Sequence, residues 1–169
     1  CVELRQTYAN NSKVIVLNTM VGFEGDNTLG KILSSTPIPV DFDLLSIDID
    51  GNDYHVWEAL RNYTPKVVVI EFNPTIPNNI AFVQEARMTV NQGSSLHAMV
   101  ELGKRKGYEL VAVTAFNGIF VHGPLFARFG IPDNSLTVLR PDSPYETRLY
   151  QMFDGTLVLE GCTQMLWQN

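Results

Sequence analysis

The sequence has few of the features that mark a nucleic-acid-binding, membrane-spanning or disulfide-rich protein. It contains no long basic run and its formal net charge is −6, so we expect no non-specific binding to nucleic acid or to a membrane surface. No apolar run approaches the ~18 residues that a membrane span requires. The two cysteines, Cys1 and Cys162, lack metal-type spacing and are too few for a disulfide framework.

The composition is that of a globular domain with a proper core. The chain has 169 residues, of which 45% are apolar and 18% charged, which suits one domain. It starts at Cys1 with no targeting signal before it, and we expect the beginning of the protein to be missing, through processing or because this is part of a longer chain. We assign residues 1–123 to a partial α/β core. Residues 124–169 are expected to form an extension packed on the same domain, with a short helix at 145–153.

Short apolar runs separated by helical patterns predict a parallel sheet. The runs occupy residues 14–17, 44–49 and 67–72. Between the last two, Asp53 is placed to cap a helix. Continuous apolar strands that alternate with helices are typical of a parallel sheet covered on both faces. Trp57 and Trp167 are expected to anchor the core.

The sequence changes character after the third run. Residues 73–95 show no periodic pattern, and loops of this length usually carry function or are disordered. Ser94 or Ser95 is expected to cap the next helix, which Gly107 ends. Asn117-Gly118 then lies between two β-type runs and predicts a tight hairpin. The residues alone therefore indicate an α/β sheet with an antiparallel final pair.

Acidic residues gather where two of the predicted strands end. Asp48 and Asp50 close one strand and Asp53 follows them, while Glu71 and Asn73 close the next strand. Ligands of open parallel sheets bind outside the carboxyl ends of the strands, and neighbouring strands lie about 4.8 Å apart. These oxygens could therefore converge on one hard cation, and two or three carboxylates with an amide suit Mg²⁺. Asp48 could also act as a general base toward a hydroxyl.

Structural explanations stay open for the same residues. Asp53 would serve as an N-cap, Asp50 would belong to a turn with the glycine after it, and Asp48 would accept backbone N–H groups. Glu71 would pair with Lys66 or with a nearby arginine.

Three stretches, "LLSIDIDGNDYHVWEAL", "VVVIEFNP" and "GYELVAVTAFNGIFV", together resemble the later half of an FkbM-type methyltransferase. The strand-four signature of that family, a hydrophobic run followed by acid-x-acid-Gly, is similar to residues 47–51, and its next strand ends in an acid as at Glu71. The likeness covers roughly residues 14–121. It implies a Rossmann-like class I sheet, mostly parallel, whose last strand is inserted antiparallel, with strands three to seven present and the N-terminal strands missing.

The resemblance implies an S-adenosylmethionine-dependent O-methyltransferase acting on a small-molecule or sugar hydroxyl, with residues 74–93 selecting the substrate. Asp48 and Asp50 would be catalytic, and Asn18 and Asp48 would contact the cofactor. Metal-dependent catechol-type enzymes are similar in holding Mg²⁺ at such positions, here Asp48, Asp50, Glu71 and Asn73. The family's glycine-rich cofactor loop has no counterpart in this sequence, so the chain would depend on a missing N-terminal segment. Assembly into a large homo-oligomer would instead favour a structural role.

Two other classes of function fit parts of the same pattern. A non-catalytic domain with a methyltransferase-like sheet would serve as a structural or interaction module, and the absent cofactor loop favours it. The "DID" at residues 48–50 also resembles the acid-x-acid element of metal-dependent glycosyltransferases, although no basic residue lies close by to meet a diphosphate.

Overall fold

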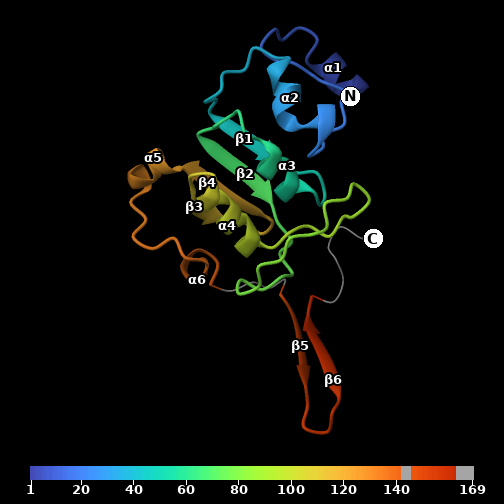
Figure 1. Ribbon diagram of the computed structural model, residues 1–169, viewed down its shortest axis with the longest axis vertical. Helices are drawn as coiled ribbons and strands as arrows, with labels where there is room; N and C mark the ends of the chain where they lie inside the picture. Colours follow the sequence, from blue (N-terminus) through green and yellow to red (C-terminus); the bar gives the residue numbers. More distant parts are fainter. Residues whose placement is uncertain (142–145, 163–169) are drawn as a thin grey trace.

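The computed structural model of the chain describes residues 1–141 and 146–162, and it is a mixed α/β structure (Figure 1). Trp167, expected in the core, lies outside the described residues. The elements are α1 (Val2–Thr7), η1 (Gly25–Asn27), α2 (Leu29–Ser34), β1 (Leu44–Ile47), α3 (Asp53–Ala59), β2 (Val67–Glu71), α4 (Leu96–Arg105), β3 (Tyr108–Val113), β4 (Asn117–His122), α5 (Gly123–Phe126), η2 (Ala127–Phe129), α6 (Leu136–Leu139), β5 (Thr147–Gln151) and β6 (Leu157–Gly161).

The central sheet has four strands in the order β1-β2-β4-β3. β1 and β2 are parallel, and β4 is antiparallel to both of its neighbours. Three strands therefore run in one direction and the last strand of this sheet is inserted between two of them. The prediction of an α/β sheet ending in an antiparallel pair is confirmed at this level, although only one pair of neighbouring strands is parallel.

One face of the sheet carries the core. Leu45 and Ile47 of β1, and Val68 and Ile70 of β2, are buried because alternate side chains of a strand point to the same face. α3 and α4 pack beside each other on the sheet (Figure 1). The second face is only half-buried or exposed at the intervening positions of β1 and β2. The expectation that both faces are covered is therefore wrong for these two strands.

Trp57 is the largest residue of this core. Its side chain is fully buried, and its ring centroid lies 5.1 Å from that of Phe120 and 5.7 Å from that of Tyr108. A Cβ at Gly103 of α4 would lie 3.0 Å from the Phe120 ring and 3.2 Å from the Trp57 ring. The absence of a side chain at Gly103 thus lets α4 approach the sheet closely, and the prediction that Trp57 anchors the core is confirmed.

The predicted strand at residues 14–17 does not form. Ile15 is 54% exposed and Leu17 is 44% exposed, and the segment has no strand partner. A β-type run becomes a strand only when a neighbouring backbone completes its hydrogen bonds, and within residues 1–141 and 146–162 no strand is paired with β1 on its outer edge.

One further local prediction needs correction. The β3–β4 hairpin exists, but its turn lies before Asn117, where Thr114 N–H donates to the Asn117 carbonyl at 2.8 Å; Asn117 and Gly118 are instead the first residues of β4. Ser95, by contrast, caps α4 as predicted, its hydroxyl accepting from Ala98 N–H at 3.1 Å. Gly107 follows that helix with φ +81°, a left-handed conformation suited to glycine.

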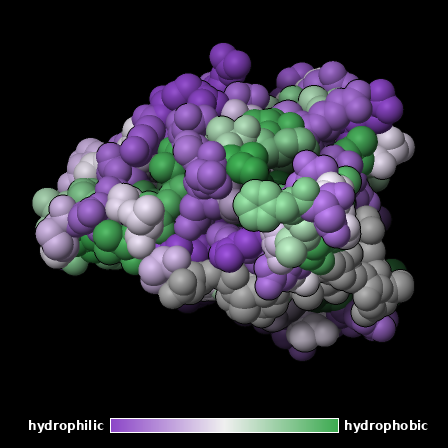
Figure 2. All heavy atoms as spheres, turned by 90° about the horizontal axis from the view of Figure 1, so that it is seen from below, coloured by the Kyte–Doolittle hydropathy of each residue, from purple (hydrophilic) through white to green (hydrophobic). Residues whose placement is uncertain are grey.

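The C-terminal extension contains a hairpin where a helix was expected. β5 and β6 form a separate antiparallel sheet that protrudes from the body of the molecule (Figure 1). Leu149 and Leu157 are each 67% exposed, and viewed from this end the surface shows apolar groups scattered among polar ones (Figure 2). Each residue of β5 is paired with a residue of β6, and this pairing overrides the helical pattern. Among the described residues, no helix is long and apolar enough to cross a bilayer.

Candidate functional site

The acidic stretch after β1 forms a tight turn that Asp53 holds together. One carboxylate oxygen of Asp53 accepts from Ile49 N–H at 3.1 Å and the other from Gly51 N–H at 3.0 Å. Asp53 is the first residue of α3 and Asn52 is the N-cap position, so the prediction of Asp53 as N-cap is wrong by one residue. Its carboxylate binds backward to the turn instead of forward into the helix.

The same turn forces two residues into positive φ. Asp50 has φ 56°, which is uncommon for a residue with a side chain although aspartate tolerates it. Gly51 has φ +143°, and a Cβ there would lie 2.9 Å from Asn91 Cα. Only glycine fits this position without displacing the neighbouring loop.

The parallel pairing of β1 and β2 brings Asp48 and Glu71 to the same edge. The register pairs Ile47 with Ile70, so its continuation by one residue places Asp48 beside Glu71. Both lie on the sheet face opposite the buried Ile47 and Ile70, because side chains alternate along a strand. The carboxylates therefore gather beside the uncovered face and not inside the core.

Three acids converge closely enough to share a cation. One carboxylate oxygen each from Asp48, Asp50 and Glu71 lies within 4.8 Å of the other two. Oxygens on one Mg²⁺ lie about 3 Å apart when adjacent and about 4 Å when opposite, given Mg–O distances of about 2.1 Å. Since Asp48 and Asp50 are exposed, small rotations of their side chains would bring the three carboxylate oxygens to these separations. A set of three carboxylates fits a hard divalent cation.

A small cavity lies beside this cluster. Its volume is about 10 Å³, roughly the space that one water molecule needs. The lining residues are Asp50, Gly51, Asp53, Glu71, Phe72, Asn73 and Gly93. A cavity of this size accommodates an ion or a water and not an organic ligand.

Glu71 carries the clearest electrostatic signature of the site. Burial, together with the negative charges of Asp48, Asp53 and Asp50, raises the pKa of Glu71 to about 7. Burial also raises the pKa of Asp53, while its hydrogen bonds from Gly51 and Ile49 lower it. Acids crowded in this way hold a proton near neutral pH or favour a bound cation in its place.

Asn73 lines the cavity, but its side chain is engaged by protein groups. Its amide oxygen accepts from Thr75 N–H at 2.9 Å and from Thr75 Oγ1 at 2.7 Å. Its amide nitrogen donates to the Gln92 carbonyl at 2.7 Å. As a metal ligand, Asn73 would have to share its amide oxygen with Thr75. The hydrogen bonds of Asn73 instead hold the loop that follows β2.

Asn18, predicted to contact a cofactor, is exposed on the segment that precedes Gly22 and has no regular structure. It does not line the cavity at Asp50. A separate groove of about 380 Å³ lies beside its chain neighbour Leu17, between that segment and residues 33–38.

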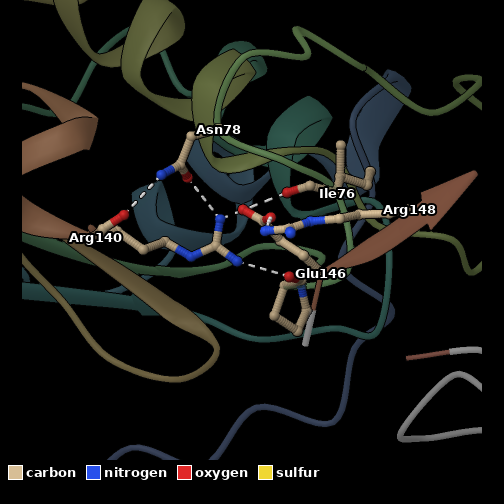
Figure 3. Close-up of polar contacts among 6 residues, drawn as sticks. Ile76, Asn78, Arg140, Glu146 and Arg148 are labelled. Atoms are coloured by element: carbon tan, nitrogen blue, oxygen red, sulfur yellow. Dashed lines mark hydrogen bonds and ion pairs between the residues drawn. The ribbon is translucent and has the colours of Figure 1, made fainter. Parts of the chain in front are cut away.

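Arg140 anchors the start of the 73–95 loop from the C-terminal extension (Figure 3). Its guanidinium donates to the Pro74 carbonyl at 2.6 Å and to Asn78 Oδ1 at 2.6 Å. It also lies 5.2 Å from the centroid of the Phe72 ring, and Phe72 lines the cavity. The C-terminal extension thus fixes the strand end that carries Glu71.

Two buried residues that join the walls of this site, Gln84 and Asn52, are not among the predicted site residues. Gln84 is 1% exposed, and its amide nitrogen donates to Asn52 Oδ1 at 2.9 Å. Asn52 is also buried and donates to the Arg87 carbonyl at 3.2 Å. A polar residue within an apolar stretch, such as Gln84 in "IAFVQEA", is the only local signal, and it does not reveal a partner 32 positions away.

Comparisons of the chain with protein-family models, with curated protein sequences and with solved structures find no match.

Proposed function

We propose that the chain is the later part of an FkbM-like class I methyltransferase that moves a methyl group from S-adenosylmethionine to a hydroxyl of a small molecule or sugar. The observation that supports this best is the strand order β1-β2-β4-β3. In the class I fold the last strand is inserted antiparallel into a sheet that otherwise runs one way, and β4 is placed in this manner between β2 and β3. The Rossmann-like identity of the sheet is part of the same proposal.

The position of the acids gives independent support. Asp48 and Asp50 follow β1, and Glu71 ends β2, at the carboxyl edge where ligands of open α/β sheets bind. The three side chains would hold Mg²⁺, whose chemistry is to lower the pKa of a substrate hydroxyl. Asp48 would accept the hydroxyl proton, the new O–CH₃ bond would form as the S–CH₃ bond breaks, and S-adenosylhomocysteine would leave. The role of the protein is then mainly to align the two reactants.

Calorimetric titration with S-adenosylhomocysteine, with and without Mg²⁺, tests this proposal. Micromolar binding of S-adenosylhomocysteine would show that these strands already form a cofactor site. We also expect a separate heat of Mg²⁺ binding that Asp48→Asn removes while circular dichroism stays unchanged. Asp43→Asn is the matched control, because Asp43 is an exposed acid at the opposite end of β1 that pairs with Lys66. A folded chain that binds neither molecule would contradict the methyltransferase proposal.

A non-catalytic module is the second candidate. It is favoured by the exposed, unpaired segment at residues 14–17 and by a cavity at the acids too small for an organic cofactor. In that case the folded chain would not bind S-adenosylhomocysteine in the calorimetric experiment. Asp48→Asn would then change neither the heat measured on adding Mg²⁺ nor the assembly of the chain.

A further inference from the structure

Gln84 lies between the acidic turn and the far end of the long loop. Its amide nitrogen donates to Asn52 Oδ1 at 2.9 Å and to the Val90 carbonyl at 3.0 Å. Its amide oxygen accepts from Gln92 N–H at 3.0 Å and from Gly93 N–H at 2.8 Å. The primary amide has two N–H donors and an oxygen with two lone pairs, and all of them are used here.

Both sides of this bridge border the site. Asn52 follows Gly51, which lines the cavity together with Gly93. A Cβ at Gly51 would lie 3.1 Å from Gln84 Oε1, and one at Gly93 would lie 3.3 Å from Asn73 Cβ. The acidic turn, residues 90–93 and the end of β2 thus lie so close together that a Cβ at either glycine would crowd its neighbours. The Gln84 side chain lies among these three segments.

The acids themselves oppose this arrangement. Asp48, Asp50 and Glu71 repel one another when ionised, and their repulsion would separate the turn from the end of β2. Gln84 links these two segments without adding charge. The amide nitrogen of Gln84 binds Asn52, which belongs to the acidic turn. The amide oxygen binds Gly93, which lies against Asn73 at the end of β2.

We propose, on the basis of the metal site proposed above, that Gln84 is a positioning residue that sets the distance between the turn carrying Asp50 and the strand end carrying Glu71. It does not touch the ion. It acts through Asn52 and Gly93, as outer groups do when they orient the ligands of a metal. Residues 84–93 are then a wall of the metal site as well as part of a loop.

Mg²⁺ titration calorimetry of Gln84→Ala tests the proposal, with circular dichroism showing that the sample is folded at the temperature used. We expect the Mg²⁺ affinity to fall by about 10–100-fold. In a second measurement with Mn²⁺, the electron paramagnetic resonance signal of the free ion should persist at Mn²⁺ concentrations at which the unaltered protein removes it by binding. A purely structural role would lower the melting temperature and leave the affinity of the folded protein unchanged. Asn79→Ala is the matched control, because Asn79 is an exposed amide on the same loop, and it should bind Mg²⁺ normally.

Asn52→Ala provides a second variant in case Gln84→Ala does not fold. It removes the acceptor of the bridge and leaves the contacts of Gln84 with Val90, Gln92 and Gly93 in place, so the same loss of Mg²⁺ affinity is expected. If the unaltered protein binds Mg²⁺ and a folded Gln84→Ala or Asn52→Ala variant binds it equally well, the positioning role of Gln84 is overturned and the metal site stands. Failure of the unaltered, folded protein to bind Mg²⁺ would overturn the metal site and this role together. If neither variant folds, the bridge belongs to the fold and the positioning role is likewise overturned.

Discussion

Replacing Glu71 by glutamine should make the protein more stable at alkaline pH and leave its stability unchanged in acid. The pKa of Glu71 is raised from 4.5 to about 7 by burial and by the charges of Asp48, Asp53 and Asp50. Below pH 4.5 the carboxyl is protonated in the folded and unfolded chains alike. As the pH rises from 4.5 to about 7 the unfolded chain loses this proton first, so stability falls across that window and the full penalty is present above it.

The size of the effect follows from the same values. A pKa raised from 4.5 to about 7 corresponds to at most about 3.4 kcal/mol. Glu71 is only half-buried, and screening by solvent reduces this to about 1–2 kcal/mol. Glu71→Gln removes the charge at every pH, so it should raise the free energy of unfolding by that amount at pH 8, equivalent to about 2–8 °C in melting temperature.

Urea unfolding at pH 4 and pH 8 in the presence of a chelator measures the difference. Glu24→Gln is the control, because Glu24 is exposed, and it should change stability at neither pH. Addition of Mg²⁺ at pH 8 should stabilise the unaltered protein and have little effect on Glu71→Gln, since the cation would replace the proton. An equal change of stability at both pH values would refute the electrostatic reasoning.

Three other substitutions test the framework of the site. Asp53→Ala should lower the free energy of unfolding by about 1–3 kcal/mol, because two N–H groups of the turn lose their acceptor; a loss below about 0.5 kcal/mol in urea unfolding would contradict this. Gly51→Ala should cost about 2 kcal/mol or more, since φ is +143° and the added Cβ meets Asn91 Cα at 2.9 Å, whereas the control Gly25→Ala has open space around its Cβ and should cost less despite its own positive φ. Arg140→Lys should destabilise by about 2–4 kcal/mol, because an ammonium cannot reproduce the two-pronged contact with the 74–78 segment; thermal unfolding equal to that of the unaltered protein would show that charge alone suffices there.

The sequence by itself determined the elements whose patterns are local. Continuous apolar runs defined β1 and β2 to within two residues, and the serine pair Ser94-Ser95 defined the start of α4 to within one residue. The acids were found for the same reason, because Asp48, Asp50 and Glu71 are covalent neighbours of the strands that position them. Parallel pairing of adjacent strands then suffices to bring their ends together.

Only the tertiary structure decided the features that depend on distant partners. The segment at residues 14–17 has a β-type composition but no neighbouring strand, and the segment at 147–151 has a helical pattern but pairs with β6. Asp53 binds backward to the turn, and Gln84 meets Asn52 across 32 positions of chain. Local periodicity reports which face of an element is apolar, whereas a hydrogen-bond partner or an adjacent strand is fixed only when the packed chain brings the two backbones together.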